Sequence, residues 1–319
     1  MRKNRKLSKN RKSIIITGGA GFIGSNLARR LLEEGYRVWV VDNLSSGFES
    51  NIPAGAEFIK MDIEDSKSYN KMPCEANCVL LHLAAQSSGE ISYEKPEVDL
   101  TTNALGTLFL LKWCLENNVS RFVYASSMAV YGNVVDLPVS EMETCQPISL
   151  YGISKMTAEN YVHHFSQMGL KTTIFRIFST YGPGQDLSNL KQGMVSIYMS
   201  FLLNKQPILV KGSKERFRDF IYIDDVVDAW IAATDNEKTF GKTYNLGTGK
   251  KTFVWELIEE EIKVFGFDPD TYSVIDAEPT PADQFGLYAD ISQISSDLNW
   301  LPKVSLAIGL KKMAEWAKA

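Results

Sequence analysis

A tyrosine and a lysine four positions apart form the strongest candidate for acid–base chemistry. Tyr151 and Lys155 stand in the segment YGISK, inside a stretch from Ser149 to Met168 with helical periodicity. Residues four apart lie on one face of a helix. Because a nearby ammonium favours the phenolate and lowers the pKa of the phenol, we predict that Tyr151 is a general base toward a hydroxyl group. The alternative is that the pair occurs on the protein surface by chance.

A serine upstream extends this candidate site. Ser127 lies just past an apolar run, Arg121–Ala125, that is typical of a buried strand. The carboxyl ends of parallel strands border the ligand crevice of an open α/β sheet. We therefore predict that Ser127 relays a proton or holds a substrate oxygen.

A glycine-rich turn forms a second candidate site. Gly18, Gly21 and Gly24 lie between an apolar run and a helical segment, in TGGAGFIGS. This spacing permits a tight turn, close approach of a pyrophosphate and close packing of the helix on the sheet. Asp42 ends the next strand, near the ~20-residue spacing expected of a ribose-binding acid. Its carboxylate would accept bonds from both ribose hydroxyls and repel a 2′-phosphate, which favours NAD over NADP. The alternative is a turn that serves packing alone.

The rest of the chain supplies the elements that position these residues. Continuous apolar runs alternate with helical segments, a pattern typical of a parallel sheet covered on both faces. The predicted strands are Ser13–Thr17, Arg37–Val41, Glu57–Lys60, Cys78–Leu83, Arg121–Ala125 and Thr172–Phe178. The predicted helices are Phe22–Leu32, Asn103–Leu115 and Ser149–Met168. The fold class is therefore α/β, a doubly wound parallel-sheet (Rossmann) domain.

After Phe178 the alternation of apolar runs and helical segments becomes less regular, which indicates a smaller α/β domain that binds the substrate. A turn, a helix and further short strands follow, including Lys242–Tyr244 with the loop NLGTG behind it. We expect the two domains to alternate along the chain. The NAD-binding domain comprises 13–178 and about 219–248, and the substrate domain about 179–218 and 249–319.

Composition and charge exclude several classes of protein. With 45% hydrophobic and 23% charged residues, the chain is neither disordered nor fibrous. No window approaches the ~20 apolar residues of a membrane-spanning helix, and we expect no membrane partner. Seven of the 34 Lys and Arg residues lie in the first 12 positions, which leaves 27 basic and 38 acidic residues in the body. An acidic body argues against nucleic-acid binding.

The basic arm, residues 1–12, has no apolar core of a signal peptide. It either binds phosphate or anionic lipid or is a disordered terminus, and we expect the second. No paired spacing of cysteines or histidines indicates a metal site. Thiols without a disulfide pattern fit a reducing, cytoplasmic location.

Several motifs together resemble one enzyme family. The chain resembles the extended short-chain dehydrogenase/reductase family, and in particular its NAD-dependent nucleotide-sugar 4-epimerases of the UDP-glucose/UDP-galactose type. The motifs are TGGAGFIGS (17–25), VVDNLSSG (40–47), HLAAQ (82–86), NALGT (103–107), YASSMAVYG (124–132), YGISK (151–155), YGPGQ (181–185), RFRDFIYIDDVVDA (216–229) and NLGTG (245–249).

The resemblance implies a mechanism. Tyr151 takes the proton of the C4 hydroxyl, while C4 gives hydride to NAD. The 4-keto sugar then rotates about its phosphate linkage and takes the hydride back on its other face. Lys155 contacts the nicotinamide ribose, and Ser127 holds the C4 oxygen.

The resemblance also implies binding residues. Those for NAD are Gly18, Gly21, Phe22, Ile23, Gly24, Asp42, Asn43, Ser46, Gly47, Asp62, Ile63, Leu83, Ala84, Ala85, Asn103, Tyr151 and Lys155. Those for the nucleotide-diphosphate sugar are Ser87, Ser127, Ser179, Arg216 and Arg218. From spacing alone, Asp62 is equally a simple loop aspartate and Arg216 equally an exposed charge.

Departures from the family pattern bear on the reaction and the substrate. Dehydratases and decarboxylases of the family carry an acid two residues after the catalytic Ser or Thr, where this chain has Ala129. Ser179 replaces an asparagine, and Thr280 replaces an arginine that binds phosphate. We expect C4 epimerisation. The alternatives are epimerisation of a UDP-glucuronate, UDP-N-acetylhexosamine, GDP- or CDP-sugar, a 4,6-dehydratase or decarboxylase, and an NAD-binding scaffold without catalysis.

Two apolar helices predict a partner surface. The segments around 98–117 and 149–168 carry more apolar residues than one sheet face needs. In the family these helices form a dimer interface, so we expect a homodimer. The alternative is burial within one chain.

Overall fold

The computed structural model describes residues 12–73, 75, 77–279 and 284–319. Most of the predicted basic arm and the departure at Thr280 lie outside these residues. Lys12, the last residue of that arm, forms an ion pair with Asp235. No described helix is long and apolar enough to cross a membrane.

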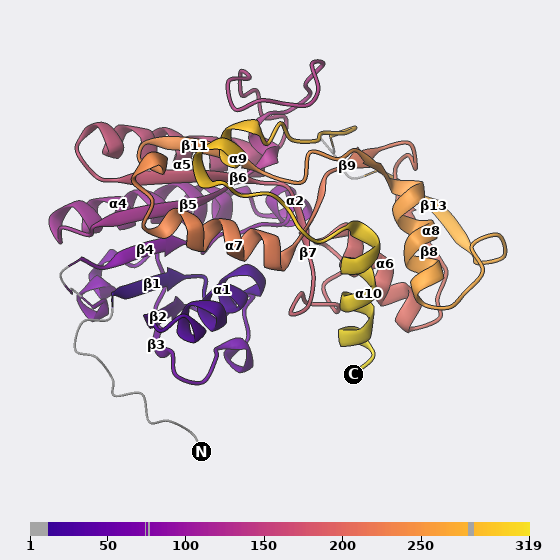
Figure 1. Ribbon diagram of the computed structural model, residues 1–319, viewed down its shortest axis with the longest axis horizontal. Coiled ribbons are helices and arrows are strands. Elements are labelled where there is room, and N and C mark those ends of the chain that lie inside the picture. Colours follow the sequence, from indigo (N-terminus) through magenta and orange to yellow (C-terminus); the bar gives the residue numbers. More distant parts are fainter. Residues whose placement is uncertain (1–11, 74, 76, 280–283) are drawn as a thin grey trace.

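A seven-stranded parallel sheet forms the centre of the molecule (Figure 1). Its strand order is β3-β2-β1-β4-β5-β6-β11, so the direction of strand addition reverses between β1 and β4. This is the doubly wound order of dinucleotide-binding folds, and it confirms the predicted fold class. The strands are β1 (Ser13–Thr17), β2 (Arg37–Asp42), β3 (Glu57–Lys60), β4 (Val79–His82), β5 (Arg121–Ser127), β6 (Thr172–Ile177) and β11 (Lys242–Leu246).

The apolar strands are buried from both sides, because helices cover both faces of the sheet. Within β1, Ile14 and Ile16 join the core beneath one pair of helices, while Ile15 joins the core beneath the other pair. Full burial of one such side chain stabilises the fold by about 1.5–3 kcal/mol. One face carries α1 (Phe22–Glu33) and α7 (Ile223–Thr234), and the other α4 (Thr107–Glu116) and α5 (Leu150–Gln167).

The predicted helix Asn103–Leu115 has a different form in the structure. A π-helical turn, Asp99–Gly106, precedes α4. At Gly106 the turn lies so close to Ile63 that an added Cβ would come within 2.9 Å of that side chain. Two short helices that the sequence did not indicate come before it, α2 (Gly89–Glu94) and α3 (Pro96–Val98). Periodicity alone does not distinguish a π-turn from an α-helix.

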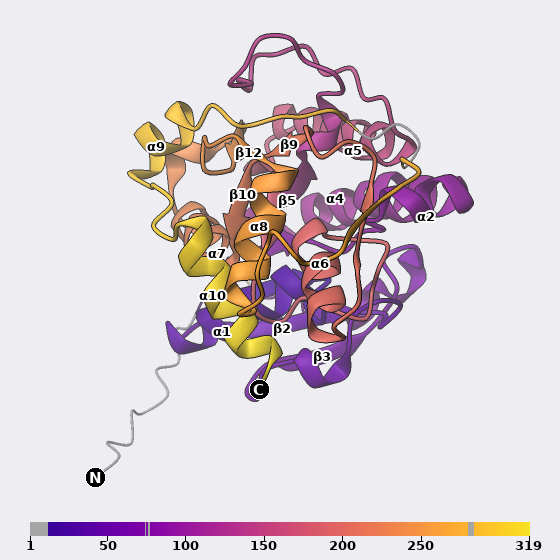
Figure 2. The ribbon, with the colours of Figure 1, turned by 90° about the vertical axis from the view of Figure 1, so that its right-hand side faces the viewer.

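A smaller helical part lies beside the carboxyl ends of the strands (Figures 1 and 2). Among the described residues it comprises two-stranded pairings and the helices α6 (Met194–Leu203), α8 (Val254–Val264) and α10 (Leu306–Ala317). The helix α9 (Ser292–Leu298) lies instead beside β11 and α7 of the main part. The pairings are β7 (Ser179–Tyr181) with β10 (Phe220–Tyr222), β9 (Phe217–Arg218) with β12 (Thr252–Phe253), and β8 (Ile208–Lys211) with β13 (Val274–Ala277).

A buried aspartate connects the two parts. Asp219 lies between β9 and β10, and its carboxylate accepts hydrogen bonds from the backbone N–H groups of Thr248, Gly249 and Ala289 at 2.8–3.1 Å. Burial raises its pKa, and these hydrogen bonds oppose that rise. The motifs around 216–229 and 245–249 thus meet, although a long helix separates them in sequence.

A buried ion pair holds α5 against the sheet. Glu159 of α5 accepts hydrogen bonds from Arg176 of β6, at 2.8 Å to Nη2, and from the Ser126 hydroxyl of β5. The carboxylate raises the pKa of Arg176 above its ordinary value despite burial. Removing one partner of such a pair costs about 3–5 kcal/mol.

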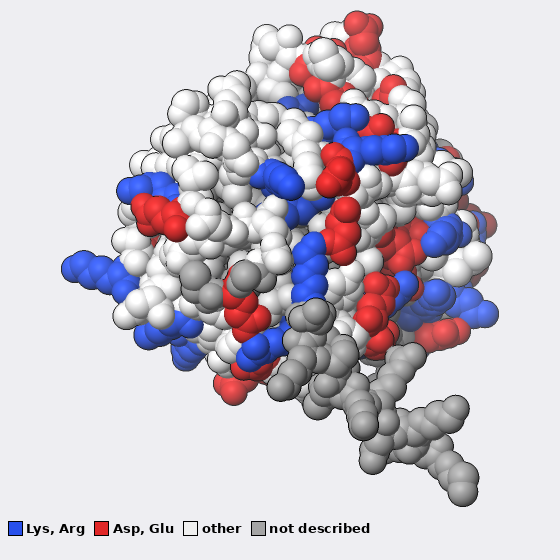
Figure 3. Space-filling view, turned by 60° about the vertical axis from the view of Figure 1, so that its left-hand side comes forward, with Lys and Arg blue, Asp and Glu red and all other residues white. Residues whose placement is uncertain are grey.

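On the face shown in Figure 3, Lys and Arg side chains are interspersed with Asp and Glu. Such mixing gives no continuous positive field along which a nucleic-acid backbone would bind.

A buried histidine cross-links the sheet and α4. The His82 Nδ1 lies 2.7 Å from the Thr17 hydroxyl oxygen, and its Nε2 lies 2.9 Å from that of Thr107. Burial, with the positive charge of Lys155, lowers the pKa of His82 to about 3. The ring is therefore neutral at physiological pH and serves packing.

This histidine makes stability depend on pH. The unfolded chain takes up a proton at His82 below about pH 6.5, whereas the folded chain does so only near pH 3. Lowering the pH from about 7 to about 5 should therefore reduce the free energy of unfolding by about 2 kcal/mol through this group. Urea unfolding at both pH values, compared with His82→Gln, isolates the contribution. Equal pH dependence in both chains would contradict it.

Candidate active site

A single large cavity brings most of the predicted site residues together. It has a volume of about 1390 Å³ and lies where the strand order reverses, between the sheet and the smaller part. The predicted residues that line it are Gly18, Gly21, Phe22, Ile23, Gly24, Asp42, Asn43, Ser46, Gly47, Ile63, Leu83, Ala84, Ala85, Ser87, Ser127, Tyr151, Lys155, Ser179, Arg216 and Arg218.

Two predicted cofactor residues, Asp62 and Asn103, stand behind the cavity wall. Asp62 accepts a hydrogen bond from the Asn43 side-chain amide at 2.9 Å. Asn103 is buried and exchanges hydrogen bonds with the backbone of Gln86, at 2.9 and 3.0 Å. Both residues support loops that line the cavity, and their contact with NAD stays a prediction.

The glycine turn has the shape of a phosphate site. Gly18 has a φ of +71°, and a Cβ there would come within 2.6 Å of the Ala84 nitrogen. A Cβ at Gly24 would overlap the Gly18 carbonyl oxygen. Gly21 precedes α1, and within the described chain no side chain caps this helix. The uncapped helix start therefore leaves its backbone N–H groups for an anion in the cavity, which fits the pyrophosphate of NAD.

The end of β2 fits the ribose. Asp42 is 8% exposed, and its two carboxylate oxygens accept hydrogen bonds from the backbone N–H groups of Ala20 and Leu44, at 3.0 and 2.8 Å. Each oxygen has a second lone pair for a ligand hydroxyl. The loop that follows packs closely on the glycine turn, since a Cβ at Gly47 would lie 2.8 Å from the Ala20 backbone.

Close packing of α5 brings the three predicted catalytic residues to one wall. The Ser149 hydroxyl caps the helix by accepting from the Gly152 N–H at 3.0 Å. Gly152 lies against the Ala129 carbonyl, where a Cβ would overlap the oxygen. Tyr151, in the first turn, thus lies beside Ser127 at the end of β5, with which its side chain is hydrogen-bonded.

Lys155 lies one turn further along α5. Its Nζ donates to the Ala125 carbonyl at 3.0 Å and lies 5.9 Å from the centre of the Tyr151 ring. Burial lowers the pKa of Lys155 to about 8, while the negative charges of Asp99 and Glu159 oppose this.

The pKa of the phenol differs from the sequence prediction. Burial raises the pKa of Tyr151 to about 12, the hydrogen bond from Ser127 lowers it, and the charge of Asp99 raises it. Sequence spacing predicted a lowered pKa, but loss of water around the buried phenol raises it. The site as folded thus holds a protonated Tyr151 beside a lysine that titrates near neutral pH.

Two buried arginines line the opposite side of the cavity. Arg218 is 5% exposed, and its Nη2 donates to the Gln284 carbonyl at 2.8 Å. Arg216 donates through Nε to the Ser213 carbonyl at 2.9 Å. Burial and then the positive charge of Arg216 lower the pKa of Arg218 to about 10. Two guanidinium groups this close favour an anion between or beside them.

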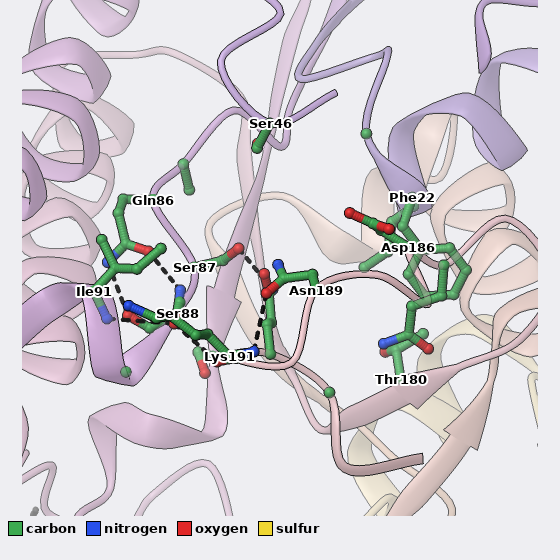
Figure 4. Close-up of a pocket in the computed structure, with 18 of the residues that line it drawn as sticks. Phe22, Ser46, Gln86, Ser87, Ser88, Ile91, Thr180, Asp186, Asn189 and Lys191 are labelled. Atoms are coloured by element: carbon green, nitrogen blue, oxygen red, sulfur yellow. Dashed lines mark hydrogen bonds between the residues drawn. The ribbon is translucent and has the colours of Figure 1, made fainter. Parts of the chain in front are cut away.

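A segment before α6 lies against the loop 86–88 at the cavity, and Figure 4 shows Lys191 facing Ser87 and Ser88. The Gln192 amide donates to the Ser87 hydroxyl at 2.7 Å, and the Ser88 hydroxyl donates to the Lys191 carbonyl at 2.9 Å. Sequence reasoning missed Ser88 and Gln192. Gln86 stood in a quoted motif, but nothing in its spacing indicated its partners.

Comparisons with known proteins agree with this geometry. The family model of the NAD dependent epimerase/dehydratase family matches residues 14–247. The chain belongs to this family. NAD is therefore its cofactor, as the glycine turn and Asp42 indicate. Among described residues, no group of three His, Cys, Asp or Glu side chains is placed to hold a metal ion.

Relatives among the nucleotide-sugar epimerases match 95–96% of the chain. The UDP-glucose 4-epimerase of Mycolicibacterium smegmatis is 32% identical over 311 residues, 95% of this chain and 97% of the relative. The structure of the Thermotoga maritima UDP-glucose 4-epimerase with UDP-glucose is 36% identical, with a TM-score of 0.90 and coverage of 96% and 98%. The UDP-glucuronic acid 4-epimerase of Bacillus cereus, solved with UDP-glucuronic acid and NAD, is 28% identical, with a TM-score of 0.86 and coverage of 96% and 99%.

The glycine turn permits a test of cofactor binding. In Gly21→Ala, the added methyl meets only the Gly18 carbonyl oxygen, at 3.3 Å, but occupies the space above the helix start. We expect NAD affinity to fall about tenfold or more while the thermal unfolding midpoint of the NAD-free protein changes little. Isothermal titration with NAD measures the affinity. In Gly24→Ala, by contrast, backbone overlap should lower both quantities. Unchanged NAD affinity in Gly21→Ala would contradict the assignment.

Proposed function

We propose that the protein inverts C4 of a nucleotide-diphosphate sugar of the UDP-glucose/UDP-galactose type. The observation that carries this proposal is the placement of Tyr151, Ser127 and Lys155 on one wall of a cavity that also holds Arg216 and Arg218. The family membership supplies the reaction class. A hydroxyl beside Tyr151 and a diphosphate at the arginines would place one nucleotide sugar across the cavity.

Tyr151 and Ser127 handle the proton in the proposed reaction. Ser127 donates a hydrogen bond to the C4 oxygen of the sugar, and the Tyr151 phenolate takes the proton of the C4 hydroxyl. Bound NAD supplies the hydride acceptor and, in the return step, the hydride donor. Lys155, buried in α5, holds positive charge near the phenolate and so favours its formation from a phenol of high pKa. Tyr151 then returns the proton to the C4 oxygen of the inverted sugar.

The arginines anchor the substrate in the proposed complex. Arg218 is fixed by backbone carbonyls at 2.8 Å, so its position is set before a ligand arrives. Charge-assisted bonds from both guanidinium groups would hold the diphosphate. An anchored diphosphate leaves the sugar to rotate and present its other face. Ser179 lines the cavity with a hydroxyl, in place of the family's longer amide.

The cavity wall next to Ser127 favours epimerisation over elimination. Met128 and Ala129 both line the cavity, and neither side chain can exchange a proton. A dehydratase or decarboxylase needs a further acid or base at this point. Formation of a 4-keto-6-deoxy product would therefore overturn the proposal.

We also propose the division into an NAD-binding part and a substrate part at the boundaries given above.

The proposal predicts conversion of UDP-galactose to UDP-glucose in the presence of NAD. We expect Tyr151→Phe to lose at least about a hundredfold in kcat, because the variant lacks the phenol oxygen that is proposed to accept the proton. Chromatographic separation of the two nucleotide sugars measures the conversion. Full activity in Tyr151→Phe would exclude this residue as the base.

Absence of conversion by the wild-type chain would overturn the UDP-glucose assignment. UDP-glucuronate, UDP-N-acetylhexosamines, GDP-sugars and CDP-sugars then form the test panel, since a neighbour of this fold is a UDP-glucuronic acid 4-epimerase. No turnover with any of them, together with intact NAD binding, would favour the scaffold alternative.

We further propose a homodimer formed through the π-helical turn and α5. Leu100 (63% exposed) and Leu105 lie about one π-turn apart, and Ile153 (49% exposed) and Tyr161 lie on one stripe of α5. The turn and α5 pack against each other. Together these side chains form an apolar surface that water contacts in a single chain.

A charge in this surface should separate the subunits. We expect the wild-type protein to have the mass of a dimer by light scattering, and Ile153→Asp that of a monomer, since burying an unpaired carboxylate is costly. Leu301→Asp, at an exposed leucine outside this surface (61% against 49% for Ile153), should leave the dimer intact. A monomeric wild-type chain would contradict the proposal.

A further inference from the structure

A buried aspartate near the catalytic residues has no role in the mechanism above. Asp99 begins the π-helical turn and is 2% exposed. Its carboxylate accepts hydrogen bonds from the Gln86 side-chain amide at 2.6 Å and from the Ser92 hydroxyl. Both donors are neutral groups. Burying a carboxylate costs several kcal/mol, so its retention beside an active site calls for a function.

Gln86 connects Asp99 to the loop that lines the substrate end. The Gln86 Oε1 accepts from the Ser88 N–H at 2.5 Å, and its Nε2 donates to the Ser88 carbonyl at 2.9 Å. Gln86, Ser87 and Ser88 all line the cavity, and Figure 4 shows Gln86 directly beside Ser88. The Asp99 carboxylate thus orients the amide that shapes this loop.

The same residues connect to the catalytic helix. Asn103, one turn after Asp99, bonds the Gln86 backbone, and its Nδ2 also donates to the Ser154 hydroxyl at 2.9 Å. The Ser154 hydroxyl donates to the carbonyl of Tyr151 at 2.8 Å. An unbroken chain of hydrogen bonds therefore runs from the substrate-facing loop to the backbone of the catalytic tyrosine.

Charge gives Asp99 a second effect on the site. Its carboxylate raises the pKa of both Tyr151 and Lys155. The other titratable groups facing these two residues are Tyr124 on β5, His82 on β4 and Glu159 on α5. The first two stay neutral through burial, and Glu159 is paired with Arg176.

We propose that Asp99 is a positioning residue for the reaction. Through Gln86 and Asn103 it holds the substrate-facing loop 86–88 at a fixed position relative to Tyr151. Its negative charge contributes to the electrostatic potential at the Tyr151 phenol and the Lys155 ammonium. This inference rests on the proposed function for the substrate and for the role of Tyr151 and Lys155.

Asp99→Asn tests the charge. The amide oxygen can still accept from Gln86, and the new NH₂ can donate to the Ser92 hydroxyl, so the shape is kept while the charge is lost. We expect the whole pH profile of kcat to move to lower pH by roughly 0.5–1 unit, because the pKa values of Tyr151 and Lys155 both fall. KM should change little. A profile that coincides with that of the wild type would overturn the effect of charge.

Gln86→Ala tests the loop. We expect KM for the nucleotide sugar to rise about tenfold and kcat to fall, because the loop loses the hydrogen bonds of the Gln86 side chain to Ser88 and Asp99. An unchanged KM would overturn this role of the loop.

Asn103→Ala tests the coupling. It removes the bonds of Asn103 to the Gln86 backbone and to the Ser154 hydroxyl, both of which Gln86→Ala leaves in place. Hydrogen–deuterium exchange of the substrate-free protein gives an independent readout. Amides at 150–155 should exchange several-fold faster in Asn103→Ala. Unchanged exchange there would overturn the coupling.

Asp225→Asn is the matched control. Asp225 is equally buried, and its carboxylate accepts two hydrogen bonds, at 2.9 and 3.0 Å, on α7 away from the cavity. It should lower stability without moving the pH profile or the exchange at 150–155. Because the exchange measurement needs no substrate, failure of the proposed function, seen as no turnover with any nucleotide sugar, is distinguishable from failure of this inference.

Discussion

The contact between the turn after β1 and the end of β4 is the constraint on which the site depends. Gly18 takes a left-handed conformation against the backbone at Ala84, where no side chain would fit. This contact packs the turn after β1 against the end of β4, at the point where the strand order reverses. A crevice lies there, outside the carboxyl ends of the strands. The helix that follows then begins at the crevice without a side-chain cap. A binding site for an anion is thus a consequence of close backbone packing.

Buried carboxylates organise the rest of the molecule around that crevice. Asp219 is held by backbone N–H groups, Glu159 by an arginine and a serine, and Asp99 by neutral side chains. Asp219 and Glu159 join segments that are distant in sequence, and Asp99 joins the π-helical turn to α2 and to the loop at Gln86. Removing a partner of any of them would be costly. The first two connect the smaller part and α5 to the sheet.

An acidic chain can hold anionic ligands because the positive groups are local. The described surface mixes both signs of charge on the face seen in Figure 3, and the excess of 38 acidic over 27 basic residues beyond the first 12 adds no attraction. Inside the cavity, however, the uncapped start of α1 and the buried Arg216 and Arg218 act at short range in a medium of low dielectric constant. Net charge therefore says little about what this protein binds.

The sequence by itself determined the fold class and the cofactor, and it predicted the catalytic residues. Apolar runs mark strands wherever both faces are buried, and the glycines and Tyr151–Lys155 act through local geometry that spacing encodes. Only the tertiary structure decided the electrostatics and the connections. Burial, which spacing does not reveal, raises the pKa of Tyr151. Asp99, Gln86 and Ser154 are ordinary residues in sequence, and they become one network only because folding brings the π-helical turn, a loop and α5 within hydrogen-bonding distance.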